Sequence, residues 1–437
     1  MSLSGPERCV SNFVQFIFAC ALWGILPCVA YAAAPSLTLE EAVRRAVARD
    51  PQLQAEQDGV TAAKARVRQA DVRPNPEIGV DVENFAGTGG QRSFAGAEVT
   101  LGLTQKIELG GKRETRVSVA ERRVDVARLA RAELERDIVV QTAAIYAAAA
   151  AAVRTQAALK DHIQDLERIV GMLKRRATSG AAPLADATRA EIDLARARAD
   201  LDAARAEAET TKGRLALITG IALDGLVLPA SVPADEGRTA SYEVLEAGLA
   251  QHPRLARLTA AQRERTAQLA AETATAAPDV TVGVGVRRRE GEDDTGFVVS
   301  AAMPLQVFDR NEGNIDAAKA ELARSNAELD SGRRTLALEF QAAFADANAA
   351  CDRTQRLSRD IVPAAGRILA ETESGFSKGR SNALVLLDAV KAKASAQIDA
   401  AQAGVQCARA RVNLMTLTGL QPATGKPAVW LSAQGDE

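Results

Sequence analysis

Two spacings of apolar residues alternate along the chain. In four short stretches, apolar and polar residues take turns one by one, which is the spacing of a β-strand with one apolar and one polar face. These strands are predicted over residues 76–84, 97–108, 279–287 and 296–306. Elsewhere, apolar residues recur every three or four positions in long stretches rich in alanine and charge, which is the spacing of helices. The pattern predicts a mainly α protein with a small β part.

The predicted helices are of two lengths. They cover residues 38–72, 112–178, 184–219, 242–276, 311–377 and 383–418. Each of the two long helices, which show heptad spacing typical of a coiled coil, would form a rod of roughly 100 Å at a rise of about 1.5 Å per residue. The two moderate helices of each half add up to nearly the same length, so they could stack end to end beside the long one.

The chain repeats itself. Landmarks recur in the same order at nearly constant distances, 202 residues for two proline pairs and 199 for two glycine pairs. The pairs are Pro51 and Pro253, Pro76 and Pro278, Gly180 and Gly379, and Gly220 and Gly419. We therefore predict two copies of a helix–β-hairpin–long helix–helix unit. They occupy residues 35–220 and 242–419, with a linker over 221–241 and a C-terminal tail over 420–437.

The N-terminus has the features of an export signal. Arg8 precedes an apolar run over residues 13–29, and small residues follow at Ala32 and Ala34, as at a signal-peptidase site. We predict that residues 1–34 are a signal peptide and that the mature chain is exported. A membrane anchor is the alternative for this run, and a lipid on Cys28 is another. No later segment approaches the about 20 apolar residues of a spanning helix, so none is predicted in the mature chain.

The composition narrows the classes of protein to which the chain can belong. Hydrophobic residues make up 47% of the chain but aromatic residues only 3%, which favours long packed helices over ordinary globular cores. The 54 basic and 56 acidic residues are interspersed, so no basic face predicts nucleic-acid binding. No H-E-x-x-H motif occurs, and no pairing of cysteine with histidine recurs in the two halves. We therefore predict a protein that is not an enzyme.

No metal or cofactor site is predicted either. The histidines, His162 and His252, are far apart, and no cluster of cysteine and histidine has the spacing of metal ligands. His252 takes the place of Asp50 in the repeat, directly before a proline, which predicts a turn or helix-start residue rather than a metal ligand.

The apolar face of the predicted sheet needs a partner. A sheet with one wet face is the usual interpretation, but the helices here are largely charged and already pack on one another. Lipid is the remaining environment, and it requires a closed barrel without free edges. Four strands cannot close a barrel, so the sheet must be shared among copies of the chain. The polar face would then line the lumen, with acidic side chains at Glu77, Asp81, Glu83 and Glu98.

The duplicated, exported architecture resembles the TolC-like outer-membrane efflux family over essentially the whole mature chain. The junctions QKIELGGKRE (105–114) and FDRNEGN (308–314) are most similar to its heavy-metal (CzcC-like) branch. The resemblance implies a homotrimer in the outer membrane, with a twelve-strand barrel continued by an α-helical tunnel across the periplasm. It also implies a periplasmic adaptor, an inner-membrane RND pump and passive conduction of divalent heavy-metal cations. The same channel serving a drug pump, or a periplasmic coiled-coil adaptor, are the alternatives.

The resemblance also implies a gate at the periplasmic ends of the helices. The family motif places an aromatic residue and a glycine at Phe376 and Gly379, and its second acidic position at Asp388, while Val385 stands at the first. Arg380 lies one place from the family's basic residue. A single acidic ring is therefore expected. For Asp388, a solvated carboxylate near a helix N-terminus is the alternative.

The first helical tip contains the corresponding glycine, Gly180, and Asp186 is predicted to be the counterpart of Asp388 there.

Gly110 and Gly111 stand where the second strand gives way to a long helix. A phosphate-binding loop is excluded because Lys106 replaces its first glycine and Arg113 its hydroxyl residue. We predict a strand–helix joint, with Asp309 in the corresponding joint of the second repeat.

Cys351 and Cys407 are equidistant in sequence from residue 379, at the tip of the second hairpin. Antiparallel helices would bring them to one height, where a disulfide is possible in an oxidising compartment. Two small buried thiols are the alternative.

Overall fold

The computed structural model describes residues 36–94, 96–228 and 241–419. The predicted signal peptide, most of the linker and the whole C-terminal tail lie outside these residues. The helices are α1 (Leu39–Arg49), α2 (Pro51–Ala70), α3 (Lys112–Thr178), α4 (Leu184–Thr219), α5 (Tyr242–Gly248), α6 (Pro253–Thr275), α7 (Glu312–Arg356), α8 (Val362–Ser377) and α9 (Ala383–Leu417). The strands are β1 (Glu77–Glu83), β2 (Glu98–Ile107), β3 (Val280–Arg289) and β4 (Asp294–Ala302). The mainly helical fold class with one small sheet is confirmed.

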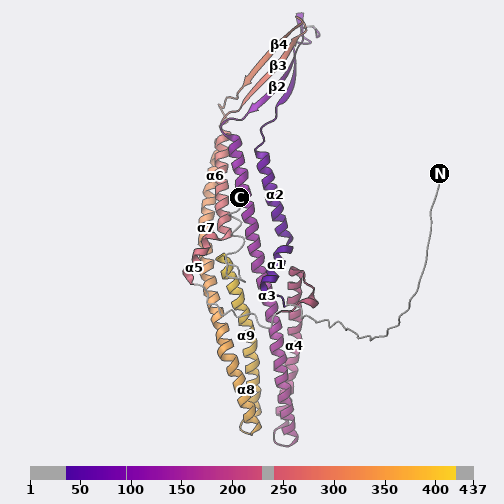
Figure 1. The fold of residues 1–437 in the computed structure, drawn as a ribbon, viewed down its shortest axis with the longest axis vertical. Helices are drawn as coiled ribbons and strands as arrows, with labels where there is room; N and C mark the ends of the chain where they lie inside the picture. Colours follow the sequence, from indigo (N-terminus) through magenta and orange to yellow (C-terminus); the bar gives the residue numbers. More distant parts are fainter. Residues whose placement is uncertain (1–35, 95, 229–240, 420–437) are drawn as a thin grey trace, which may run out of the picture. The chain divides into compact units, whose positions relative to one another are not determined.

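The helices form parallel rods with the sheet at one end (Figure 1). Long α3 packs against α2 and α4, and also against α6 and α9, while α7 packs against α6 and α9. The end of α4 meets the end of α1, where Gly220 lies against Arg49, and the end of α9 meets α5, where Thr418 lies against Gly248. The shorter helices thus follow one another along each long rod.

Prolines divide three helices that the sequence predicts as continuous. The predicted helix over 242–276 is divided into α5 and α6, and Pro253 is the first residue of α6. Pro51 is the first residue of α2, and Asp50 caps that helix by accepting a hydrogen bond from Gln52 N at 2.8 Å. In the second long rod, a π-helical turn (Leu357–Ile361) separates α7 from α8 just before Pro363. A proline has no N–H and its ring crowds the carbonyl four residues earlier, which a wider turn accommodates. The predicted helix over 311–377 is therefore interrupted.

The strands form one antiparallel sheet in the order β1-β2-β3-β4. Its register aligns Val80 with Leu101, Leu101 with Val286, and Val286 with Phe297. Every second residue on each strand therefore contributes to one apolar face, on which Ile78 is 78% and Phe297 92% exposed. β1 and β4 each have one edge that pairs with no described strand.

The last predicted strand is shorter than expected. β4 ends at Ala302 rather than near residue 306. Pro304 lies just beyond this end, and a proline cannot donate a hydrogen bond to a strand ladder.

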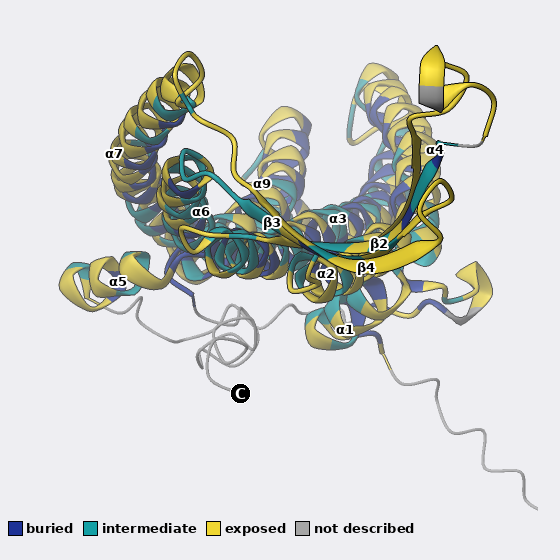
Figure 2. Ribbon diagram, turned by 90° about the horizontal axis from the view of Figure 1, so that it is seen from above, coloured by how far each residue is buried: buried dark blue, intermediate teal, exposed yellow. Residues whose placement is uncertain are grey.

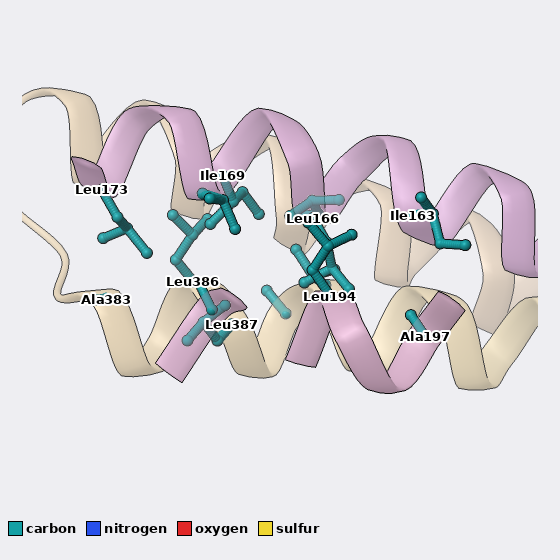
Figure 3. Close-up of a cluster of buried hydrophobic side chains, with 14 of the residues drawn as sticks. Ile163, Leu166, Ile169, Leu173, Leu194, Ala197, Ala383, Leu386 and Leu387 are labelled. Atoms are coloured by element: carbon teal, nitrogen blue, oxygen red, sulfur yellow. The ribbon is translucent and has the colours of Figure 1, made fainter. Parts of the chain in front are cut away.

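The largest apolar cluster lies near the free ends of the helices, away from the sheet. Leu166, Ile169 and Leu173 of α3 are fully buried against Leu386 and Leu387 of α9 (Figure 3). Residues of α4 and α8 complete the cluster, so both hairpins share one core.

One described helix, α3, contains a stretch that is long and apolar enough to cross a membrane by composition alone. This differs from the expectation of no such segment. Half of that stretch is buried within the protein, as in the core helix of a bundle.

Cys351 of α7 and Cys407 of α9 are joined by a disulfide, with their Cα atoms 4.6 Å apart. Of the two interpretations that the sequence left open, the structure adopts the bonded one.

His252 is the N-cap of α6, the role that Asp50 has for α2. Its Nδ1 accepts a hydrogen bond from Arg254 N at 3.1 Å, and the residue is only 2% exposed. Burial lowers the pKa of His252 from 6.5 to about 4, helped by the positive charges of Arg136 and Arg254. The imidazole is therefore neutral in the folded chain at neutral pH.

We expect His252→Asp to make the protein less sensitive to acid. Because the folded pKa lies below the unfolded one, the stability that neutral His252 provides is complete above pH 6.5 and is lost as the pH falls towards 4. This loss is about 2 kcal/mol between pH 7.5 and 5.0. Aspartate keeps the cap without that titration. Denaturant unfolding of both proteins at the two pH values measures the difference, and equal losses would contradict the expectation.

Candidate functional site

The joint between β2 and α3 consists of two glycines in the left-handed region. Gly110 has φ 70° and Gly111, the N-cap of α3, has φ 72°. A Cβ on Gly110 would lie 2.5 Å from the Cβ of Ala277 and 3.1 Å from the carbonyl oxygen of Ala274, at the end of α6. A glycine is therefore required at position 110 for two reasons. Its backbone is left-handed, and the end of α6 lies too close to leave room for a Cβ.

The second repeat builds the same joint from different residues. Asn311, the N-cap of α7, has φ 60°, which asparagine tolerates better than most residues. Asp309 Oδ1 accepts a hydrogen bond from Asn311 N at 2.9 Å, and Asn311 Nδ2 donates to the carbonyl oxygen of Glu272 at 2.8 Å. The left-handed cap thus recurs although the Gly-Gly sequence does not.

Asp279 stabilises the first joint, between β2 and α3. This role was not identified from the sequence. Its Oδ1 accepts hydrogen bonds from Lys112 Nζ at 2.6 Å and Leu109 N at 3.3 Å, and its Oδ2 lies 3.0 Å from Lys106 Nζ. Burial alone would raise the pKa of Asp279, but the hydrogen bonds from Lys112 and Lys106 lower it below its ordinary value. The sequence feature that could have indicated this role is the position of Asp279 in the repeat, 202 residues after Glu77.

Arg116 ties the same joint to the end of α2. It donates to both carboxylate oxygens of Glu108, at 2.6 and 3.1 Å, and its Nε donates to the carbonyl oxygen of Ala70 at 2.9 Å. The hydrogen bond from Arg116 lowers the pKa of Glu108. Both carboxylates at this joint therefore stay charged well below neutral pH.

The four acidic residues predicted for the lumen lie on the polar face of the sheet. Register places Glu83 opposite Glu98, with Glu77 and Asp81 on the same side of β1. Arg287 of β3, which the sequence did not single out, lies 3.3 Å from Glu83 and 3.1 Å from Glu98. Two of the four carboxylates are thus paired with one arginine.

The two helical tips are built alike. Gly180 after α3 and Gly379 after α8 have φ 70° and 71°. Each is followed by a backbone hydrogen bond that closes the helix end, from Ala181 N to Arg176 O at 2.8 Å and from Arg380 N to Gly375 O at 2.7 Å. This is the arrangement of a Schellman cap.

The side chain of Phe376, which the gate motif would place at the pore, is buried within the chain. It is 4% exposed and belongs to the apolar cluster shared by the hairpins. The guanidinium of Arg176, from the first hairpin, lies 4.8 Å from the centre of its ring and donates to its carbonyl oxygen. Arg176 therefore links the two tips, a role that the sequence did not reveal.

This link arises where the repeats differ. With the 199-residue offset of the tip glycines, Arg176 and Ala177 align with Gly375 and Phe376. Each repeat supplies the large side chain at the position where the other has a small one.

The other predicted gate residues lie at the surface. Asp388 and Arg380 are exposed, and Asp186 is half-buried. Neither Asp388 nor Arg380 has a side-chain hydrogen bond or ion pair with any residue that the structure describes. The same offset aligns Asp186 with Val385, and Asp388 with Arg189, so Asp186 corresponds to the first acidic position of the motif rather than to Asp388.

Buried ion pairs join the hairpins further from the tips. Lys393 of α9 lies 2.7 Å from the buried carboxylate of Asp165 in α3, and Lys391 lies 2.8 Å from that of Asp193 in α4. Removing one partner of such a pair would leave a buried charge uncompensated. No group of three potential metal-ligating side chains occurs in residues 36–94, 96–228 and 241–419.

We expect Gly110→Ala to destabilise the protein more than Gly111→Asn. Alanine at position 110 must adopt a left-handed backbone, at a cost of about 1–2 kcal/mol, and must also displace the end of α6. Asparagine at position 111 reproduces the cap that Asn311 forms in the other repeat. Thermal unfolding of the purified variants compares them; equal midpoints would show that the contact with Ala277 is unimportant.

Comparison with known proteins agrees with this architecture. The family model described as "Outer membrane efflux protein" matches residues 42–221 and 244–420. The cobalt-zinc-cadmium resistance protein CzcC of Cupriavidus metallidurans is 27% identical over 367 residues, which are 84% of this chain and 86% of that protein. The nickel and cobalt resistance protein CnrC of the same organism is 28% identical over 330 residues, 75% of this chain and 78% of that one.

A solved structure shows the same fold. The outer membrane protein VceC of Vibrio cholerae superposes with a TM-score of 0.70 at 18% identity, covering 87% of this chain and 96% of that chain. Because the family model spans both repeats, the resemblance found in the sequence is confirmed. The chain belongs to the outer membrane efflux protein family: it is an outer-membrane efflux channel and not an enzyme.

Proposed function

We propose that the chain forms the exit duct of a tripartite RND-type efflux system and passively conducts divalent heavy-metal cations to the exterior. In this proposal, three copies share their sheets in one barrel, and the helices form a tunnel through the periplasm to an adaptor and an inner-membrane pump. Residues 1–34 serve as the export signal, and residues 35–220 and 242–419 are the two repeats. The tunnel needs no cofactor.

The observation that carries the proposal is the register of the sheet. It gathers the valines, leucines and phenylalanine of four strands on one exposed face and leaves both outer strands with an unpaired edge. In a membrane, such edges must be paired by closing the sheet into a barrel. Twelve strands from three copies meet this requirement, whereas a single copy does not.

Divalent metals are proposed as the substrate because the relatives CzcC and CnrC are named for resistance to cobalt, zinc, cadmium and nickel. The exposed carboxylate of Asp388 supports cation passage, since three copies would place a ring of like charges near the tips. In the barrel, Glu77 and Asp81 would add unpaired negative charge to the lumen.

Deletion of the gene tests the substrate. We expect the strain to become sensitive to cobalt, zinc or cadmium, and complementation with the wild-type chain to restore growth. Asp388→Asn should restore resistance only in part, because the tip then attracts cations less strongly. Growth is measured across metal concentrations, with Asp186→Asn compared in parallel. Loss of drug resistance alone would instead favour the alternative of a channel that serves a drug pump.

A tip variant tests the gate. Arg176→Ala removes both contacts with Phe376, so we expect the tips to separate more readily and the single-channel conductance in planar bilayers to rise severalfold. Arg175→Ala is the matched control, because this neighbour makes neither contact. Unchanged conductance in Arg176→Ala would show that Arg176 does not contribute to the gate.

A further inference from the structure

Three helices of one copy enclose a groove between the strand–helix joints and the tips. α9 packs against both α3 and α7. In the end-on view, α9 lies between these two helices (Figure 2). The groove that all three line has a volume of about 710 Å³. This is the size of sites that hold a drug-sized organic molecule.

The apolar lining of the groove consists of small side chains. Residues from all three helices contribute to it: Val140 and Ala144 of α3, Ala349 and Ala350 of α7, and Ala403 and Ala410 of α9. Because alanine and valine project little from a helix, they leave room between the helices and present a smooth apolar surface. A flat ring or a short hydrocarbon chain can lie against such a surface.

The polar lining of the groove comes from α9 and α7. Gln406, Arg409 and Asn413 follow one another at spacings of three and four residues, so they lie on one face of α9. α7 contributes Arg353 and, two turns earlier, Asp346. Two guanidinium groups and one carboxylate thus line the groove, which gives it a net positive charge.

Both arginines are available to a ligand. Arg353 and Arg409 are exposed, and neither side chain has a hydrogen bond or ion pair with any residue in the described part of the chain. They lie 26 and 30 residues from Gly379, at the tip between the antiparallel helices. This difference corresponds to about 6 Å along the helices, which two arginine side chains can span. One negatively charged molecule can therefore contact both.

The disulfide fixes the two helices that carry these arginines. Cys351 and Cys407 are bonded, with their Cα atoms 4.6 Å apart, and each precedes one of the arginines by two residues. The relative position of α7 and α9 is therefore set before a ligand enters. A site that is held in place in this way loses less conformational entropy on binding.

The aligned positions of the first repeat differ. With the 199-residue offset, Gln406 and Arg409 align with Glu207 and Thr210 of α4. A glutamate in place of Gln406 would repel an anion, and a threonine in place of Arg409 would not attract one. The combination of polar groups that suits an anion therefore belongs to the second repeat.

We infer that the groove between α3, α7 and α9 binds a small organic anion. Its apolar body lies against the alanines, and its carboxylate or sulfonate group pairs with Arg353 and Arg409 through charge-assisted hydrogen bonds. Gln406 and Asn413 offer further hydrogen bonds. The two guanidinium groups disfavour a metal cation in this groove, so its ligand differs from the proposed cargo. Because one copy forms the whole groove, the inference depends on neither the trimer nor metal transport.

Equilibrium dialysis tests the site with naphthalenedisulfonate, a rigid aromatic dianion that is fully ionised at neutral pH. The purified chain is kept in a nonionic maltoside detergent, so that the micelles do not attract the probe. We expect saturable binding of the probe to the wild-type chain. A naphthyl trimethylammonium cation should not bind, and sulfate at the concentration of the probe should not displace it.

Variants of the lining identify the site. Arg353→Ala and Arg409→Ala should each weaken binding about tenfold, because each removes one hydrogen-bonded charge. Arg356→Ala is the matched control, since this exposed arginine of α7 lies outside the groove, and it should leave the affinity unchanged. Ala349→Leu fills the groove from an exposed position, so it should weaken binding with both arginines in place.

Several results would overturn the inference. These are a wild-type chain that does not bind the probe, equal affinity of the wild type and both arginine variants, and displacement of the probe by sulfate. None of them bears on the proposed duct. Conversely, a chain that binds the probe but restores no metal resistance to the deletion strain would overturn the proposed function and leave the groove in place.

Discussion

The apolar face of the four-stranded sheet constrains everything else in this protein. Within one copy, nothing described covers Ile78, Val80, Leu101, Val284 or Phe297, although burying such side chains is the main driving force of folding in water. The helices cannot supply the cover, because they lie beyond one end of the sheet and pack on one another. In the proposed assembly, the apolar face meets lipid and the edges of the sheet meet strands of other copies. The strand pattern thus gives a physical reason for the outer-membrane location of the family.

The strand–helix joints show how the chain passes from the lipid-facing sheet to the helices outside the membrane. Strand and helix meet at a left-handed residue, Gly111 or Asn311, and each joint is fastened by carboxylates of nearby segments, Asp279 in one and Asp309 in the other. Because several hydrogen bonds converge on each joint, the direction of the long helix is fixed relative to its strand. The sheet and the helices can therefore be placed precisely without a large apolar interface between them.

The sequence predicted what depends on periodicity and repetition. Alternation located all four strands, and Gly180 and Gly379 marked both tips, because a left-handed helix end favours glycine regardless of context. It did not reveal Asp279, Arg287 or Arg176, since their partners lie far away in sequence and an isolated charge looks like any solvated residue. The π-helical turn was missed because Pro363 sits in an otherwise regular helical pattern. Repeat alignment could have indicated the Arg176–Phe376 contact, since large and small residues exchange places there.

That exchange has a consequence for symmetry. Two similar repeats in each of three copies would give the proposed assembly six nearly equivalent units around its axis. At the joints, Gly111 and Asn311 adopt one left-handed conformation, so the backbone there is close to sixfold although the side chains around it differ. At the tips, Arg176 and Phe376 distinguish the repeats, so the symmetry there falls to threefold. The tips of the proposed assembly would thus alternate between two kinds of hairpin, one that contributes Arg176 and one that contributes Phe376.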